Sequence, residues 1–143
     1  MIDFMQLAIE EALNSDGDIP VGAVIVHNNE VLASACNRKE KDNDITSHAE
    51  ILAIRRAEKV LNNWRLDNCD MYVTLEPCPM CGWAIIQSRI KNLYFGSYDA
   101  NYGAFSSKID LRSLAQGAKL NVYGGIKEQE CDKFLKDFFI KIR

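Results

Sequence analysis

The chain has 143 residues, of which 48% are hydrophobic and 26% are charged, a balance that excludes a disordered or fibrous protein. At about 150 residues per domain, this length predicts a single domain over residues 1–143. No apolar run approaches the about 20 residues of a transmembrane helix. No basic patch opens the chain as in a secretory signal, so we expect a cytoplasmic protein with no membrane partner.

The formal net charge of −3 limits how the chain can bind nucleic acid. Proteins that bind by bulk electrostatics are usually basic, so such a partner would need a local basic patch or a pocket that reads a few exposed nucleotides. The five cysteines are an odd number, and without an export signal we expect no disulfide framework. Cys36, Cys69 and Cys131 are predicted to be small buried apolar residues.

Hydrophobic spacing predicts alternating helices and strands. We expect helices over residues 2–13, 47–61, 79–88, 107–116 and 131–142. We expect strands over residues 21–26, 31–36, 71–75, 93–95 and 120–123, of which the first two form a hairpin. Pro79 suits the first position of its helix, where the missing N–H is not needed. The long connection before the fifth strand permits it to run parallel to the fourth. The pattern predicts a three-layer α/β/α fold with a mixed five-stranded sheet.

One constellation carries chemistry: His48-Ala49-Glu50, followed by Pro77-Cys78-Pro79-Met80-Cys81. One imidazole and two thiolates are good zinc ligands, and three protein ligands leave the fourth position of a tetrahedral zinc open. Water at that position becomes a source of hydroxide near neutral pH. We therefore predict a catalytic zinc ion held by His48, Cys78 and Cys81.

Glu50 is not expected to be a ligand, because residues two apart do not share a helix face. The order H-x-E…P-C-x-x-C is the known signature of zinc nucleobase deaminases. In that chemistry, hydroxide on the zinc attacks a ring carbon, while Glu50 shuttles the water's proton to the ring nitrogen and helps protonate the departing ammonia. Helix N-termini at Ser47 and Pro79 are expected to direct their positive ends toward the site.

Each part of this motif also has a structural interpretation. Ser47 with Glu50 fits a capping box, and a Cys-x-x-Cys pair also occurs in structural zinc sites and redox proteins. A structural zinc would need a fourth protein ligand, for which the candidates are His27, Cys36 and Cys69. A structural-zinc RNA-binding module is therefore the non-enzymatic alternative.

With these motifs in place, the chain resembles the bacterial tRNA-specific adenosine deaminases of the cytidine deaminase-like superfamily. The similar segments span nearly the whole chain, at residues 19–23, 36–38, 46–50, 72–78, 88–90, 96–104 and 137–139. The segments 88–90 and 96–104 matter most, because the zinc signature alone is shared with cytosine, guanine and cytidine deaminases. A small-molecule deaminase of guanine, cytosine or a nucleoside is the enzymatic alternative.

The resemblance implies a cytidine deaminase-like fold and a homodimer with one Zn²⁺ per subunit. It implies conversion of adenosine to inosine, by attack at C6, at the wobble position (34) of a tRNA anticodon stem-loop. It also implies that Asn37 contacts the target nucleoside and that Asp99 lies beside the flipped nucleotide. An amide can donate and accept on one base edge, and an anticodon loop presents unstacked bases. The alternatives are a turn residue for Asn37 and an ordinary loop carboxylate for Asp99.

Two positions depart from the family pattern. Trp83 stands where relatives commonly carry small residues, and we expect it to bury into the core or to reshape the pocket or the dimer contact. Ser47 replaces a commoner Ala. Lys141 and Arg143 cluster at the end of the last helix and are candidates for phosphate contacts.

Overall fold

The computed structural model describes residues 1–115 and 117–142, and its centre is one mixed β-sheet. The strands lie in the order β2-β1-β3-β4-β5. Their bounds are β1 Gly22–His27, β2 Glu30–Cys36, β3 Cys69–Leu75, β4 Asn92–Ser97 and β5 Asn121–Tyr123. Strand β1 is antiparallel to β2 and β3, whereas β3, β4 and β5 are parallel. The predicted parallel pairing of the fourth and fifth strands is therefore confirmed.

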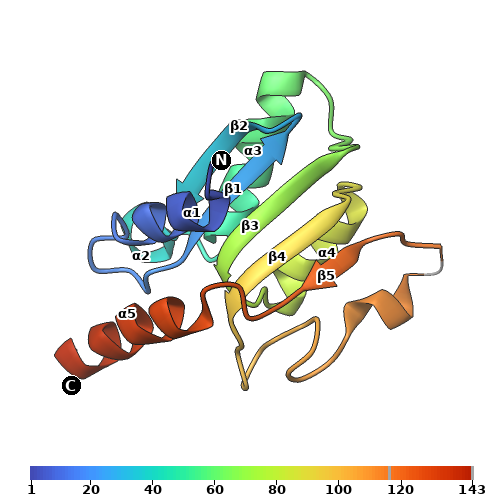
Figure 1. Ribbon diagram of the computed structural model, residues 1–143. Coiled ribbons are helices and arrows are strands. Elements are labelled where there is room, and N and C mark those ends of the chain that lie inside the picture. Colours follow the sequence, from blue (N-terminus) through green and yellow to red (C-terminus); the bar gives the residue numbers. More distant parts are fainter. Residues whose placement is uncertain (116, 143) are drawn as a thin grey trace.

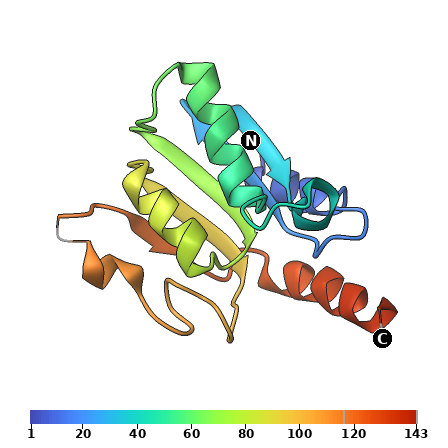
Figure 2. The same ribbon diagram turned by 180° about the vertical axis from the view of Figure 1, so that it is seen from behind.

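Helices cover both faces of this sheet. They are α1 Phe4–Ala12, α2 Lys39–Asp42, α3 Ala49–Leu61, α4 Pro79–Gln87, the 3-10 helix η1 Leu111–Leu114 and α5 Glu128–Lys141. Figure 1 shows α1 and α5 on the near side of the sheet, and Figure 2 shows α3 and α4 on the opposite side. The predicted three-layer α/β/α fold is confirmed. Within the described residues, no helix has the length and apolar composition needed to span a membrane.

Strand β1 shows why two helical layers are needed. Its side chains alternate between the faces of the sheet. Ala23 and Ile25 belong to the hydrophobic cluster beneath α3 and α4, and Val24 and Val26 belong to the cluster beneath α1. A strand that is apolar on both faces must be covered on both. The central strands are therefore fixed within the core, and the ends of the sheet are left to carry polar chemistry.

The fourth predicted helix, over 107–116, is wrong except for its centre. Only Leu111–Leu114 is helical, as a 3-10 turn, and Gln116 lies outside the described residues. The preceding segment forms a loop instead, because the Glu76 carboxylate accepts hydrogen bonds from its backbone N–H groups. A buried carboxylate distant in sequence thus replaces the i→i−4 bonds of a helix.

Two other helices differ from the prediction. Helix α2 was not predicted, because it has no apolar stripe. Its first turn is held by the distant Asp18, whose carboxylate accepts a hydrogen bond from the N–H of Glu40 at 2.8 Å. Helix α5 begins at Glu128, and of the predicted apolar stripe only Cys131 is buried. Arg143 lies outside the described residues, so its predicted role is not addressed. The other predicted buried cysteines, Cys36 and Cys69, are indeed buried.

Candidate active site

The predicted metal-ligating side chains lie where two helices begin. His48 is the N-cap residue of α3 and Cys78 is the N-cap residue of α4. Neither side chain makes a capping hydrogen bond to its own helix. Cys81 follows in the first turn of α4, and Pro79 occupies its predicted place at the start. Both helix starts meet at the same end of the sheet, as Figure 2 shows, so both positive helix ends face the site.

The three side chains are close enough to share one metal ion. His48 Nδ1 lies 3.8 Å from Cys78 Sγ and 3.3 Å from Cys81 Sγ, and the three atoms all lie within 4.8 Å of one another. Zinc bonds of about 2.0–2.3 Å give a tetrahedron with edges of about 3.5–3.8 Å, close to the two distances from His48. Among residues 1–115 and 117–142, no fourth His, Cys, Asp or Glu joins this ligand group, including His27, Cys36 and Cys69. The donor set therefore fits a zinc ion with an open position.

The ligand group is partly ionised before any metal binds. Hydrogen bonds from Cys81 and from His48 lower the pKa of Cys78 to about 4. The hydrogen bond to Cys78 and burial raise the pKa of Cys81, and the hydrogen bond to Cys78 raises the pKa of His48. One thiolate is thus present at neutral pH, and zinc would displace the proton of the Cys81 thiol.

Glu50 lies beside the ligand group but does not belong to it. Its side chain is buried, with 5% exposure, and burial raises its pKa to about 7 despite the nearby charge of His48. A carboxyl group that titrates near neutral pH can both accept and release a proton, as a general acid–base group must.

The capping-box alternative for Ser47 and Glu50 is wrong. The N-cap residue is His48, and the Ser47 hydroxyl donates instead to Asp42 Oδ2 at 3.0 Å. The Ser47 carbonyl accepts from the Arg38 N–H at 2.9 Å, which ties this residue to the segment after β2. Ser47 is therefore not the capping partner of Glu50, and the structural interpretation of Glu50 as part of a capping box does not hold.

Asn37 follows β2 and has an unsatisfied acceptor. Its Nδ2 donates to the Ile19 carbonyl at 3.2 Å, while its Oδ1 is buried and has no hydrogen-bond partner among the described residues. The next residue, Arg38, is hydrogen-bonded to Ser47, which immediately precedes His48. Asn37 is therefore brought near the ligand group but is not part of it.

Asp99 shapes the loop after β4. Its Oδ1 accepts from the N–H groups of Asn101 and Tyr102, at 3.0 and 3.1 Å. Its own N–H donates to Glu76 Oε1 at 3.1 Å. Sequence reasoning passed over Glu76, which is 1% exposed, although a carboxylate between a buried strand and Pro77 was a signal that could have found it. Trp83 is 41% exposed, which contradicts only the first of its three alternatives, burial into the core.

The fold and the zinc ligands together place this chain in the class of zinc-dependent deaminases. The family model that describes the cytidine and deoxycytidylate deaminase zinc-binding region matches residues 1–97. A tRNA-specific adenosine deaminase of Bacillus subtilis is 40% identical over 146 residues, covering 98% of this chain and 89% of the relative. A solved structure from a study of A-to-I editing by tRNA:A34 deaminases has a TM-score of 0.83 at 41% identity, over 91% of this chain and 96% of that one.

A guanine deaminase structure from Bacillus subtilis is more distant. Its TM-score is 0.65 at 34% identity, over 74% of this chain and 80% of that one. The chain thus belongs to the cytidine and deoxycytidylate deaminase family, in the group of the tRNA-specific adenosine deaminases.

Proposed function

We propose that this protein, as one domain over residues 1–143, deaminates adenosine to inosine at the wobble position of a tRNA. The observation that carries the proposal is the three-donor ligand group with buried Glu50 beside it, in a chain 40% identical to a tRNA-specific adenosine deaminase over nearly its whole length. His48, Cys78 and Cys81 would hold the zinc ion. Bound zinc supplies the acidity that makes water nucleophilic near neutral pH.

Glu50 moves the protons of the reaction. Adenosine and water give inosine and ammonia, so a proton must leave the attacking water, one must reach N1 of the ring, and the departing amine must be protonated. A carboxyl group with a pKa of about 7 changes protonation state readily at neutral pH. Its burial keeps bulk water from competing for the proton. Glu50 therefore fits the role of proton shuttle.

Asn37 is proposed to bind the target nucleoside through its buried Oδ1, which has no hydrogen-bond partner among the described residues. The bond from Nδ2 to the Ile19 carbonyl fixes the orientation of the amide. Asn37→Ala is expected to raise KM about tenfold, because it removes one oriented hydrogen bond. Asn37→Asp keeps an acceptor but loses the donor to the Ile19 carbonyl, so it should also raise KM if the fixed orientation of the side chain matters. An unchanged KM in both variants would favour the turn-residue alternative.

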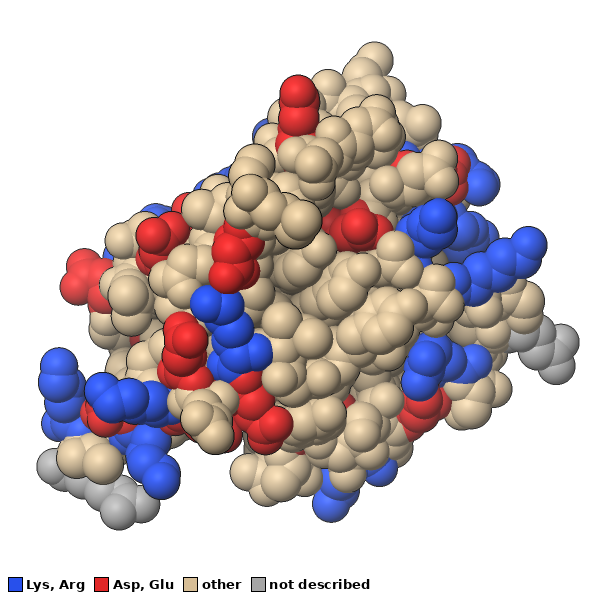
Figure 3. All heavy atoms as spheres, in the orientation of Figure 1, with Lys and Arg blue, Asp and Glu red and all other residues tan. Residues whose placement is uncertain are grey.

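A local basic patch supports tRNA binding by this acidic chain. A groove at the far end of α4 is lined by four cations, and the only acid among its described lining residues is Asp67. The cations are Arg65, Arg89, Lys91 and Lys119. Figure 3 shows Lys and Arg side chains gathered on the right of that view, beside a broad uncharged surface. We propose that phosphates of the anticodon stem lie along this patch.

A homodimer is also part of the proposal. Met80 and Trp83 lie three residues apart on α4, and are 37% and 41% exposed. Residues at this spacing share one helix face, so they offer a second copy an apolar contact. Light scattering after gel filtration should give twice the chain mass, and Trp83→Glu should give a monomer. We expect the dimer to act in the cytoplasm, where its proposed substrate is found.

The direct test uses a synthetic anticodon stem-loop with adenosine at the wobble position. Protein of measured zinc content is incubated with it, and inosine is quantified by nuclease digestion and mass spectrometry. A loop with guanosine at that position is the matched substrate control, and Glu50→Gln is the matched enzyme control. Absence of inosine with zinc-loaded protein would refute the proposed function.

A small-molecule deaminase of guanine, cytosine or a nucleoside is the second candidate, favoured by the 34% identity to a guanine deaminase. Ammonia release from guanine, cytosine and free adenosine tests it in parallel. Release from guanine that added tRNA does not inhibit would support this second candidate. A Glu50→Gln variant as active as the unmodified protein would contradict both proposals.

A further inference from the structure

A buried carboxylate joins the loop after β4 to the segment that carries Cys78. Glu76 follows β3 and precedes Pro77, so it lies two residues from a candidate zinc ligand. Its side chain is 1% exposed. No salt bridge of the described residues reaches it, so its charge must be balanced by hydrogen bonds.

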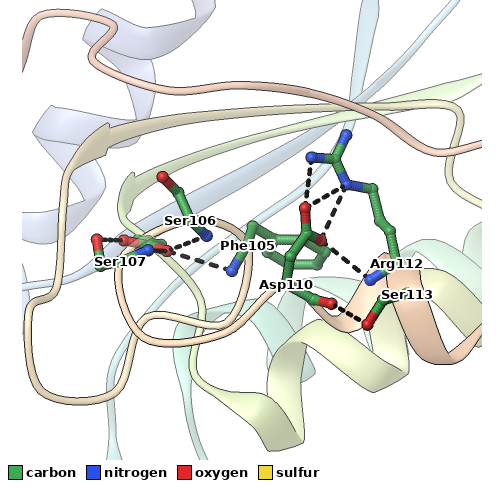
Figure 4. A network of polar contacts seen from close by, with 7 residues as sticks. Phe105, Ser106, Ser107, Asp110, Arg112 and Ser113 are labelled. Carbon is green, nitrogen blue, oxygen red and sulfur yellow. Dashed lines mark hydrogen bonds and ion pairs between the residues drawn. The ribbon is translucent and has the colours of Figure 1, made fainter.

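Five donors from the loop converge on this carboxylate. Oε1 accepts from the Asp99 N–H at 3.1 Å and from the Ser107 hydroxyl. Oε2 accepts from three successive N–H groups, those of Phe105, Ser106 and Ser107, at 3.2, 2.9 and 3.0 Å. Figure 4 shows these three residues with their contacts as dashed lines. Both ends of the loop are therefore held by one side chain.

These hydrogen bonds keep Glu76 ionised although it is buried. Burial alone would raise its pKa, but the bonds from Ser107, Asp99 and Phe105 outweigh burial and hold the pKa below its ordinary value. The fold thus retains an anion whose donors all belong to this loop. Charge-assisted hydrogen bonds of this kind are the stronger ones in proteins.

The backbone of the loop closes tightly over the same carboxylate. A Cβ atom at Gly103 would collide with the Glu76 carboxylate. The adjacent Ala104 N–H donates to the Pro77 carbonyl at 2.9 Å, directly before Cys78. The loop is therefore fixed against the metal-ligand segment from two sides.

We propose that Glu76 is a positioning residue for substrate binding, which holds the 98–107 loop so that it receives the nucleotides around the target adenosine. The inference rests on the proposed function. Glu76 binds the backbone of Asp99, and Asp99 in turn binds the N–H of Tyr102, which is 67% exposed. An exposed aromatic ring on a fixed loop is suited to stack on an unpaired base. Loosening Glu76 should therefore weaken docking of the stem-loop and leave the ligand group in place.

The test weakens the contact between Glu76 and the loop, once by a change in the carboxylate and once by a change in the loop. Glu76→Gln removes the charge, and Gly103→Ala pushes the loop away from the carboxylate. Ile9→Ala is the control: Ile9 belongs to α1 and is buried in the hydrophobic cluster on the opposite face of the sheet, so the substitution lowers stability without touching the loop. Zinc content, kcat and KM for the stem-loop are measured, together with hydrogen exchange of the 98–108 peptide.

Both loop variants should keep their zinc and raise KM about tenfold, as for the loss of one well-placed contact, with kcat within about threefold of the unmodified protein. The 98–108 peptide should exchange faster in both, and Ile9→Ala should change neither KM nor this exchange. Should Glu76→Gln fail to fold, Ser107→Ala removes a single donor as a milder substitute.

The proposed function and the positioning role of Glu76 are overturned by different results. No inosine from the unmodified protein overturns the proposed function, and the positioning role with it. An active unmodified protein whose KM is unchanged in both loop variants overturns the positioning role alone. The positioning role is likewise overturned if Ile9→Ala raises KM as much as they do, because the effect would then be one of general stability.

Discussion

Replacement of Glu50 by Gln is expected to remove activity and yet stabilise the zinc-free protein. Gln has nearly the same shape and volume, so the packing around α3 should be kept. It carries no charge, so the variant avoids the burial of an ionised carboxylate that is only 5% exposed. Zinc content should be retained, because Glu50 lies outside the ligand group.

The size of the stabilisation follows from the pKa of Glu50. Its ordinary value of 4.5 rises to about 7 in the fold, which corresponds to about 3 kcal/mol at 1.36 kcal/mol per pH unit. Between these values the folded state binds more protons than the unfolded state, so stability declines as pH rises through this window. The variant should therefore exceed the unmodified protein by about 3 kcal/mol at pH 8.5 and by little at pH 4.

Urea denaturation of chelator-treated protein at both pH values measures this difference. Glu10→Gln, which removes an exposed charge from α1, is the matched control for the loss of a carboxylate. Inosine formation by the zinc-loaded Glu50→Gln variant should fall by about 10²–10⁴-fold or more, the usual contribution of a general acid–base group. The reasoning would be refuted by a variant that is less stable at pH 8.5, or by a stability difference that is equal at the two pH values.

Three further predictions concern the metal and the core. Zinc binding at pH 7 should release the proton of Cys81, whose pKa is raised by the hydrogen bond to Cys78 and by burial. Calorimetry in buffers of different protonation enthalpy measures the release, and no release would contradict this. Gly96→Ala should lower the unfolding free energy by about 3 kcal/mol in urea titrations, because its Cβ would lie 2.5 Å from Cys131 Sγ, and a neutral effect would argue against this packing. The free energy of unfolding should also fall as the pH drops below about 4.5, because a carboxylate with a lowered pKa, such as Glu76, stops stabilising the fold when the pH falls through its pKa in the folded state. Glu76→Gln should make this loss of stability at acid pH less steep. An equally steep loss in the variant would contradict the lowered pKa of Glu76.

The elements that the sequence predicts well are those decided by local patterns. Buried strands such as β1 consist of short β-branched runs, and Pro79 marks the start of α4. The ligand group is also local in origin, because His48 and Cys78 are N-cap residues of helices whose starts can be recognised. Parallel pairing of β5 followed from the length of its connection. These features require no knowledge of distant contacts.

The elements that the sequence could not predict are decided by side chains far away in the chain. Helix α2 has no hydrophobic stripe and depends on Asp18, more than twenty residues earlier. The 98–107 loop depends on Glu76, more than twenty residues earlier. Each case is a carboxylate that binds the polar groups of another segment, an interaction that leaves no periodic trace in the sequence.

Two buried carboxylates near the ligand group show how the same cost of burying a charge leads to two different functions. Glu50 and Glu76 are 5% and 1% exposed, so burial disfavours the charge of both. Glu76 has five donors from one loop, and its pKa lies below the ordinary value; Glu50 has few, and its pKa rises to about 7. Hydrogen-bond donors rather than depth therefore decide whether such a group anchors the backbone as an anion or exchanges a proton. A shuttle surrounded by five donors would hold its charge too firmly to accept a proton, and a loop anchor without donors would lose its charge and release the loop.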